Sequence, residues 1–133
     1  MLIHFYNFLE RLKSGPAKKN KILLVATSIG LVINLATWAI IYFKFRPLVY
    51  HLPADQAFIP LHYNIYLGID SLGNWKKIFW LPGIGLIIGF INTILALMIF
   101  SKKEILSYFL SISFAVIQLF LLVATIITIL INI

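Results

Sequence analysis

The 133-residue chain contains no cysteine and only four acidic residues, against eleven Lys and Arg. Without cysteine it has no disulfide, no thiolate metal ligand, no cysteine nucleophile and no palmitoylated or lipoprotein-type anchor. Its long apolar runs also lack every Asp, Glu, Lys, Arg and His. Proton relays and voltage sensors depend on such groups within the membrane, so a proton-coupled pump is disfavoured.

What the chain has instead is long apolar sequence, in three runs: residues 22–43, 78–100 and 105–133. A bilayer core of about 30 Å needs about 20 helical residues at about 1.5 Å per residue. The sequence therefore predicts an all-α membrane protein that forms a single integral membrane domain over residues 1–133. The predicted transmembrane helices are 22–43, 78–100 and 105–130.

The first fifteen residues have the pattern of an amphipathic helix. One face would carry Leu2, Phe5, Tyr6, Leu9 and Leu12. Gly15 and Pro16 would end this helix. Three lysines follow, so we predict an interfacial helix over 1–15 that is attracted to anionic lipids. The alternative is a frayed terminus. Lys and Arg gather at the ends of apolar runs, which indicates lipid headgroups rather than nucleic acid as their partners.

The distribution of Lys and Arg predicts the orientation. The amino-terminal segment has five, the loop 44–77 has four, the short link 101–104 has two and the carboxyl end has none. By the positive-inside rule, the amino terminus and the link would be cytoplasmic, and the loop 44–77 and the carboxyl terminus external. We expect a multi-pass protein of the inner (plasma) membrane.

Local signals refine these helices and the loop. Asn20 can cap the first helix, and Ser101 with Glu104 has the spacing of a capping box for the third. The second helix either begins near Pro82 or kinks there. In the external loop, the sequence predicts an ordered cap with a small hairpin that pairs 48–51 with 61–66.

Each predicted transmembrane helix carries one amide near its middle: Asn34, Asn92 and Gln118. These side chains could form a polar binding spot or a selectivity point within the membrane. Hydrogen bonds between helices are the favoured interpretation, because such amides are common packing devices.

Small residues recur at helical spacing on all three predicted helices. They are Ala26 and Gly30, then Gly85, Gly89 and Thr93, then Ser107, Ser111 and Ala115. These faces allow close backbone approach. They could mediate packing within the chain or association into a homo-oligomer or with another membrane protein.

The loop holds the side chains that could do chemistry, among them His51, His62, Asp55 and Asp70. No H-x-x-x-H or H-E-x-x-H spacing is present, so we predict neither a metal site nor a cofactor. No nucleophile elbow, paired-carboxylate signature or phosphate-binding loop is present either, and we predict a protein that is not an enzyme.

One stretch of the loop has the form of a family motif. Residues 59–64 read Ile-Pro-Leu-His-Tyr-Asn, and Gly68, Asp70 and Gly73 follow before the second apolar helix. This pattern resembles the small bacterial membrane domain of unknown function found at the start of immunity proteins for the sporulation-delaying toxin. The likeness covers about residues 50–100. Gly68 stands one residue late, Leu72 replaces the usual Trp, and Lys76 lies one position beyond the family's Lys.

The resemblance implies an external loop used for recognition or sensing. Its candidate residues are Pro60, His62, Tyr63, Asn64, Gly68 and Asp70. The leading hypothesis is a non-enzymatic membrane protein whose loop recognises a peptide, a lipid or a neighbouring membrane protein, as an immunity-like or sensing module does. The alternatives are an oligomeric pore or transporter for an uncharged solute, and a structural subunit of a larger membrane complex. The loop's aromatic residues could also simply anchor it in the headgroup region.

Overall fold

The computed structural model describes residues 16–53, 58–64, 66 and 68–132. Within them, three helical segments are long and apolar enough to cross a membrane: Lys21–Val49, Trp75–Ile99 and Glu104–Ile131. The prediction of three helices long and apolar enough to cross a membrane is confirmed, and it indicates a membrane protein; each of these segments is called a crossing below. The predicted interfacial helix over 1–15 lies outside the described residues.

The first crossing is longer than predicted. It consists of α2 (Lys21–Ile40), a π-helical segment η2 (Ile41–Phe45) and α3 (Arg46–Val49). The expected end at residue 43 is therefore wrong, because Pro47 lies in the first turn of α3, where its missing N–H is tolerated. The predicted cap is confirmed, since Asn20 Oδ1 accepts hydrogen bonds from the backbone N–H groups of Ile22 at 3.0 Å and Leu23 at 3.2 Å.

The second crossing starts with the 3-10 helix η3 (Trp75–Phe79) and continues as α4 (Trp80–Ile99). Pro82 thus lies in the first turn of α4, which is the position where a proline sacrifices no internal hydrogen bond.

The third crossing is α5 (Glu104–Ile131). The predicted capping box is wrong, because the residue before α5 is Lys103 and no side chain caps this end. The Glu104 carboxylate accepts a hydrogen bond from the Tyr108 hydroxyl instead, one turn further along the same helix.

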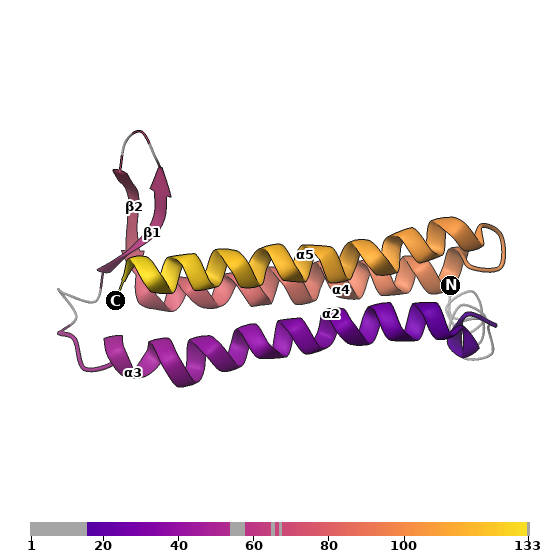
Figure 1. Ribbon diagram of the computed structural model, residues 1–133, viewed down its shortest axis with the longest axis horizontal. Helices are drawn as coiled ribbons and strands as arrows, with labels where there is room; N and C mark the ends of the chain where they lie inside the picture. The colour runs from indigo at the N-terminus through magenta and orange to yellow at the C-terminus, as the bar shows by residue number, and fades with distance from the viewer. Residues whose placement is uncertain (1–15, 54–57, 65, 67, 133) are drawn as a thin grey trace, which may run out of the picture.

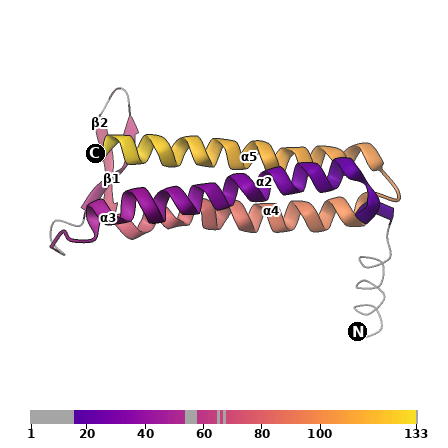
Figure 2. The ribbon, with the colours of Figure 1, turned by 60° about the horizontal axis from the view of Figure 1, so that its bottom comes forward.

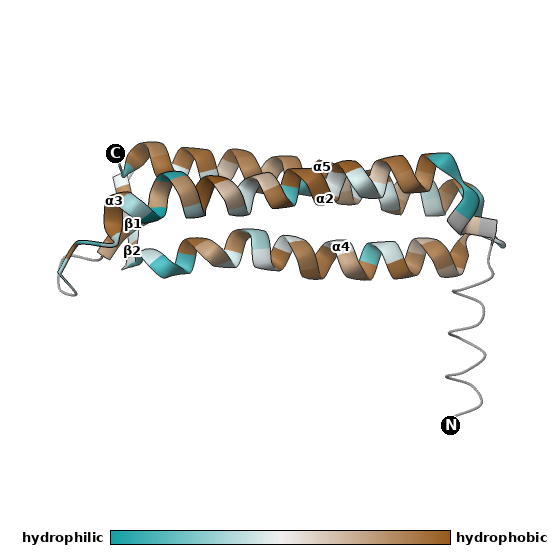
Figure 3. Ribbon diagram, turned by 90° about the horizontal axis from the view of Figure 1, so that it is seen from below, coloured by the Kyte–Doolittle hydropathy of each residue, from teal (hydrophilic) through white to brown (hydrophobic). Residues whose placement is uncertain are grey.

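The three crossings lie side by side as a bundle (Figures 1 and 2). At one end, called here the link end, are the short 3-10 helix η1 (Pro16–Lys19) and the connection between α4 and α5. At the other end, the cap end, α5 finishes beside a two-stranded hairpin. Apolar residues dominate the length of the helices and polar residues gather mainly at the two ends (Figure 3), as a bilayer environment requires.

Polar side chains lie between the helices, and large apolar ones face outward. The fully buried polar residues are Asn34, Thr37, Ser107, Ser111, Gln118 and Thr125. Large exposed side chains on α5 include Ile105, Phe109, Phe120 and Leu130. This distribution fits lipid as the solvent, because hydrocarbon gives apolar side chains no reason to be buried while polar ones need partners inside.

The tightest packing surrounds Phe114 of α5, whose ring is almost completely buried between α2 and α4. A Cβ atom placed on Gly30 would lie 2.6 Å from ring atom Cε1, and one placed on Gly89 would overlap the opposite edge of the ring. Both helices can therefore reach the ring only through glycine. Gly85, Ser107 and Ser111 are also buried, so these small-residue positions serve packing within the chain.

Gly89→Ala should lower the free energy of unfolding by about 1–3 kcal/mol, because its methyl group would overlap the Phe114 ring. Gly83→Ala is the matched control on α4, since nothing lies within 4 Å of its added Cβ. It should leave stability unchanged or raise it by up to about 1 kcal/mol through helix propensity. Unfolding in mixed detergent micelles, followed by circular dichroism, measures both. Equal stability of the two variants would contradict this packing.

Candidate functional site

The cap end carries a β-hairpin of strands β1 (Phe58–Asn64) and β2 (Gly68–Asn74), paired antiparallel. Gly68 opens β2 with a φ of 75°, a conformation that glycine adopts without strain. The hairpin predicted between 48–51 and 61–66 is wrong. Residues 48 and 49 belong to the first helix and so are not part of a strand. The strand β1 pairs instead with residues 68–74, which follow it after a short connection.

The hairpin brings together all six residues of the predicted recognition loop. Pro60, His62, Tyr63 and Asn64 are on β1, and Gly68 and Asp70 are on β2. In the backbone register, Tyr63 is opposite Ile69 and Asn64 is opposite Gly68.

The pairing is irregular in the middle of this motif, since the register shifts on both sides of His62. Leu61 and Asp70 have no direct partner across the two strands. Such bulges twist a strand and redirect side chains, and they are common next to functional sites.

The hairpin is anchored to the bundle by an apolar cluster, here called the cap base. Its buried members are Ile41, Phe45, Val49, Ile59, Trp75, Ile78 and Ile129. They come from all three crossings and from β1. In addition, Asn132 Nδ2 donates hydrogen bonds to the carbonyl of Pro60 at 2.9 Å and to that of Thr128 at 2.7 Å. The position of the hairpin is therefore fixed by the bundle rather than by the strands alone.

Beyond its anchored base, the hairpin exposes apolar side chains. Leu72 is 64% exposed and Tyr66 is 92% exposed, and Phe58 and Ile69 are exposed as well. In the described part of the chain the sheet has two strands, so the outer edge of each has no strand neighbour. An edge of this kind can pair with an extended peptide, and the apolar side chains can contact a partner or the headgroup region.

A cation, Arg46, lies beside the cap. The sequence reasoning counted it among the loop residues that could do chemistry but did not predict its contacts with two tyrosines. The guanidinium of Arg46 lies 4.8 Å from the ring centroid of Tyr42 and 5.1 Å from that of Tyr50. The three residues are four apart along the helix, and that spacing was the available signal. The stack holds a positive charge at the cap end of the first crossing.

Two of the three predicted amides meet in the middle of the bundle. Asn34 Nδ2 donates to Gln118 Oε1 at 2.9 Å and to the carbonyl of Pro82 at 2.9 Å, and Gln118 Nε2 donates to the carbonyl of Gly85 at 2.7 Å. This amide pair connects all three crossings. Gly85 makes room for it, because a Cβ there would lie 2.6 Å from Gln118 Oε1.

Asn92 does not join this pair. Its Nδ2 donates to the carbonyl of Leu110 at 3.4 Å and so connects α4 to α5 nearer the link end. At that end, Ser107 Oγ donates to the carbonyl of Ala96 at 2.6 Å. The amides thus hold the helices together at separate depths, as the packing interpretation expects.

No protein-family model, curated protein or solved structure matches this chain. Inferences about its function therefore depend on its own residues and their geometry.

The amide pair is testable with isosteric apolar substitutions. Asn34→Leu and Gln118→Met should each lower the free energy of unfolding by about 1 kcal/mol, because each removes a shared hydrogen bond. The double variant should lose less than the sum of the two. Asn92→Leu is the control, and its effect should add independently to either one. Strict additivity of Asn34→Leu and Gln118→Met would contradict the contact.

Proposed function

We propose that this chain is a non-enzymatic protein of the bacterial inner membrane whose hairpin recognises a peptide or a segment of a neighbouring membrane protein. The observation that carries the proposal is the exposed, open-edged hairpin, fixed rigidly on a bundle that has its own internal hydrogen bonds. A hairpin needed only for stability would bury its apolar side chains, yet Leu72 and Ile69 are exposed.

The mode of binding that suits this hairpin is strand addition. Backbone groups at an outer edge would pair with an extended segment, and Leu72, Ile69 and Phe58 would supply apolar contacts. The bulge around His62 would set which side chains a bound segment meets. The likeness of residues 59–70 to the immunity-protein domain supports the same role, that of an immunity-like or sensing module.

The pore or transporter hypothesis receives less support. A selectivity point needs polar groups that face a lumen. Here Asn34 and Gln118 are completely buried. Asn34 donates to Gln118 and to the carbonyl of Pro82, and Gln118 donates to the carbonyl of Gly85. The buried glycines and serines likewise pack within the chain. The role of a structural subunit is favoured by no particular contact among the described residues.

The proposed orientation places the hairpin outside the cell and the link in the cytoplasm. The chain has no cysteine, so single cysteines report it directly. Ser71→Cys lies on β2 and Ser101→Cys lies at the link end, and both positions are exposed. An impermeant thiol reagent should label Ser71→Cys in intact cells and Ser101→Cys only after lysis. The reverse pattern would overturn the orientation.

Recognition by the hairpin is testable by crosslinking in native membranes. A photoreactive amino acid at Leu72 should capture a defined partner, whereas the same group at Ile105, which is exposed at the link end, should not. His62→Ala combined with Asn64→Ala should reduce capture from Leu72 at least about tenfold, if these residues contribute about 1.4 kcal/mol or more to binding.

Membrane insertion of this double variant serves as the control, and it should match that of the unchanged chain because the cap base is intact. The hairpin proposal would fail if the crosslinked product persisted undiminished in the double variant, or if Leu72 and Ile105 captured the same product.

A further inference from the structure

A second site lies at the link end, between α2 and α4. A cavity of about 310 Å³ is lined there by Leu23, Leu24 and Thr27 of α2, Thr93, Ala96 and Leu97 of α4, and by Ala17 and Ser111. Leu24 is 53% exposed, whereas Ser111 of α5 is 1% exposed, so the cavity leads from the outer surface of the bundle inward to Ser111. Most of its lining is apolar, and two threonines and one serine supply hydroxyl groups.

The Ser111 hydroxyl is the informative group. Its Oγ is buried and has no hydrogen-bond partner within the described part of the chain. Two other serines of α5 differ, since Ser107 Oγ donates to the Ala96 carbonyl at 2.6 Å and Ser113 Oγ donates to the Phe109 carbonyl at 2.7 Å. A buried hydroxyl without a partner is unfavourable, so this cavity offers a hydrogen-bond donor to a molecule that enters it.

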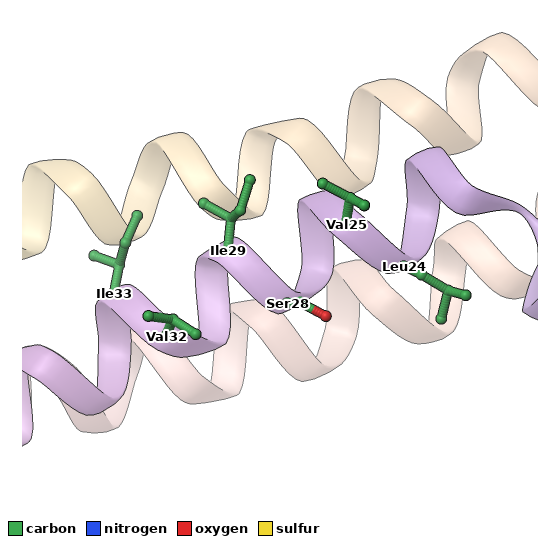
Figure 4. A pocket seen from close by; sticks show the side chains of 6 residues that line it. All are labelled: Leu24, Val25, Ser28, Ile29, Val32 and Ile33. Carbon is green, nitrogen blue, oxygen red and sulfur yellow. The ribbon is translucent and has the colours of Figure 1, made fainter.

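A neighbouring furrow shows what a surface without such an anchor looks like. Figure 4 shows its six side chains, which all come from α2: Leu24, Val25, Ser28, Ile29, Val32 and Ile33. It is a groove between the side-chain rows of one helix, and none of its residues carries an unpartnered buried polar atom. Lipid chains can cover that furrow without any specific contact. The α2–α4 cavity differs because it has walls from both helices and a polar inner end.

The link end, where the cavity lies, is rich in exposed positive charge. Lys19, Lys21, Lys102 and Lys103 are all exposed at the link end. The α2 and α5 ends are tied together there, since Asn20 Nδ2 donates to the Tyr108 hydroxyl at 2.8 Å. Among the described residues, Glu104 is the carboxylate at this end, and it accepts from the same hydroxyl. Ser111 lies seven residues inside the start of α5, or about 10 Å deeper along the helix.

We propose that the cavity holds the ester-linked end of one acyl chain of an anionic phospholipid. The lysines at the link end would meet the phosphate, the walls of the cavity would contact the glycerol-ester region and the first methylene groups, and Ser111 Oγ would donate to an ester carbonyl. Basic pockets between transmembrane helices bind anionic lipids by this combination of charge and shape. The site is separate from the hairpin and does not depend on the recognition function proposed for it.

The experiment is a lipid titration of the purified full chain in detergent, with bound lipid counted by native mass spectrometry. Phosphatidylglycerol should bind saturably and more tightly than phosphatidylcholine of the same acyl chains. Ser111→Ala should weaken phosphatidylglycerol binding about fivefold, which corresponds to one hydrogen bond. Ser113→Ala, whose hydroxyl already has a partner, is the matched control and should bind as the unchanged chain does.

Two further arms separate the parts of the proposal. Thr93→Leu narrows the cavity from the α4 wall and should abolish saturable binding, and glycerol phosphate, which has no acyl chain, should not bind. Without lipid, Ser111→Ala should unfold at the same or a higher temperature than the unchanged chain, because it removes an unpartnered hydroxyl. Equal binding of the two phospholipids, or full binding by Ser111→Ala or Thr93→Leu, would overturn the site.

Discussion

The close approach of three helices around the Phe114 ring is the constraint on which the rest of this structure depends. In lipid, apolar side chains gain little by leaving the solvent, so helices associate through van der Waals contact and interhelical hydrogen bonds. Gly30 and Gly89 bring the backbones of α2 and α4 against opposite sides of one ring of α5. That approach also positions the partners of the amide pair, because Gln118 lies one turn beyond Phe114 and its Nε2 reaches the carbonyl of Gly85. A wider bundle would break both contacts together.

The same packing explains why the two ends of the bundle differ. At the cap end, Phe45, Ile78 and Ile129 close the space between the helices and support the hairpin on top of it. At the link end, the facing residues of α2 and α4 include the small side chains of Thr27, Thr93 and Ala96, and a cavity remains between the two helices. The size of the facing side chains therefore affects where the bundle is solid and where a cavity remains.

Whether a feature could be predicted from the sequence depends on whether its physical cause is local or involves distant residues. Lipid as solvent acts on every residue of a crossing, so composition alone predicted the three spans, and Asn20 was predicted as a cap because capping is local. The hairpin partner was wrong because strand pairing depends on where the preceding helix ends, and Pro47 does not end it. The capping box failed because α5 begins at Glu104, so the cap position falls on Lys103 rather than on Ser101.

The same distinction between local and long-range causes applies to the candidate sites. The sequence predicted that the loop residues act together, and the hairpin does place Pro60 and Asn64 on one strand and Gly68 on the other. It also predicted amides at similar depth, but Asn92 lies nearer the link end, where it donates to the Leu110 carbonyl, so it was grouped with a pair that it does not touch. The cavity had no sequence signal, because an unfilled space depends on which small residues of two separate helices come to face each other.

The helix α5 connects all of these features through one stripe of side chains at intervals of three, four or seven residues: Ser111, Phe114, Gln118, Thr125, Ile129 and Asn132. From the link end to the cap end, this stripe lines the cavity, fills the glycine contact, forms the amide pair, closes the cap base and holds the hairpin at Pro60. Because the packing around Phe114 is close, a shift of α5 there would displace the helix along the rest of its length. Close-packed interiors transmit displacement rather than absorb it. The position of the hairpin is therefore determined by how α5 is seated between α2 and α4, several turns away from the strands themselves.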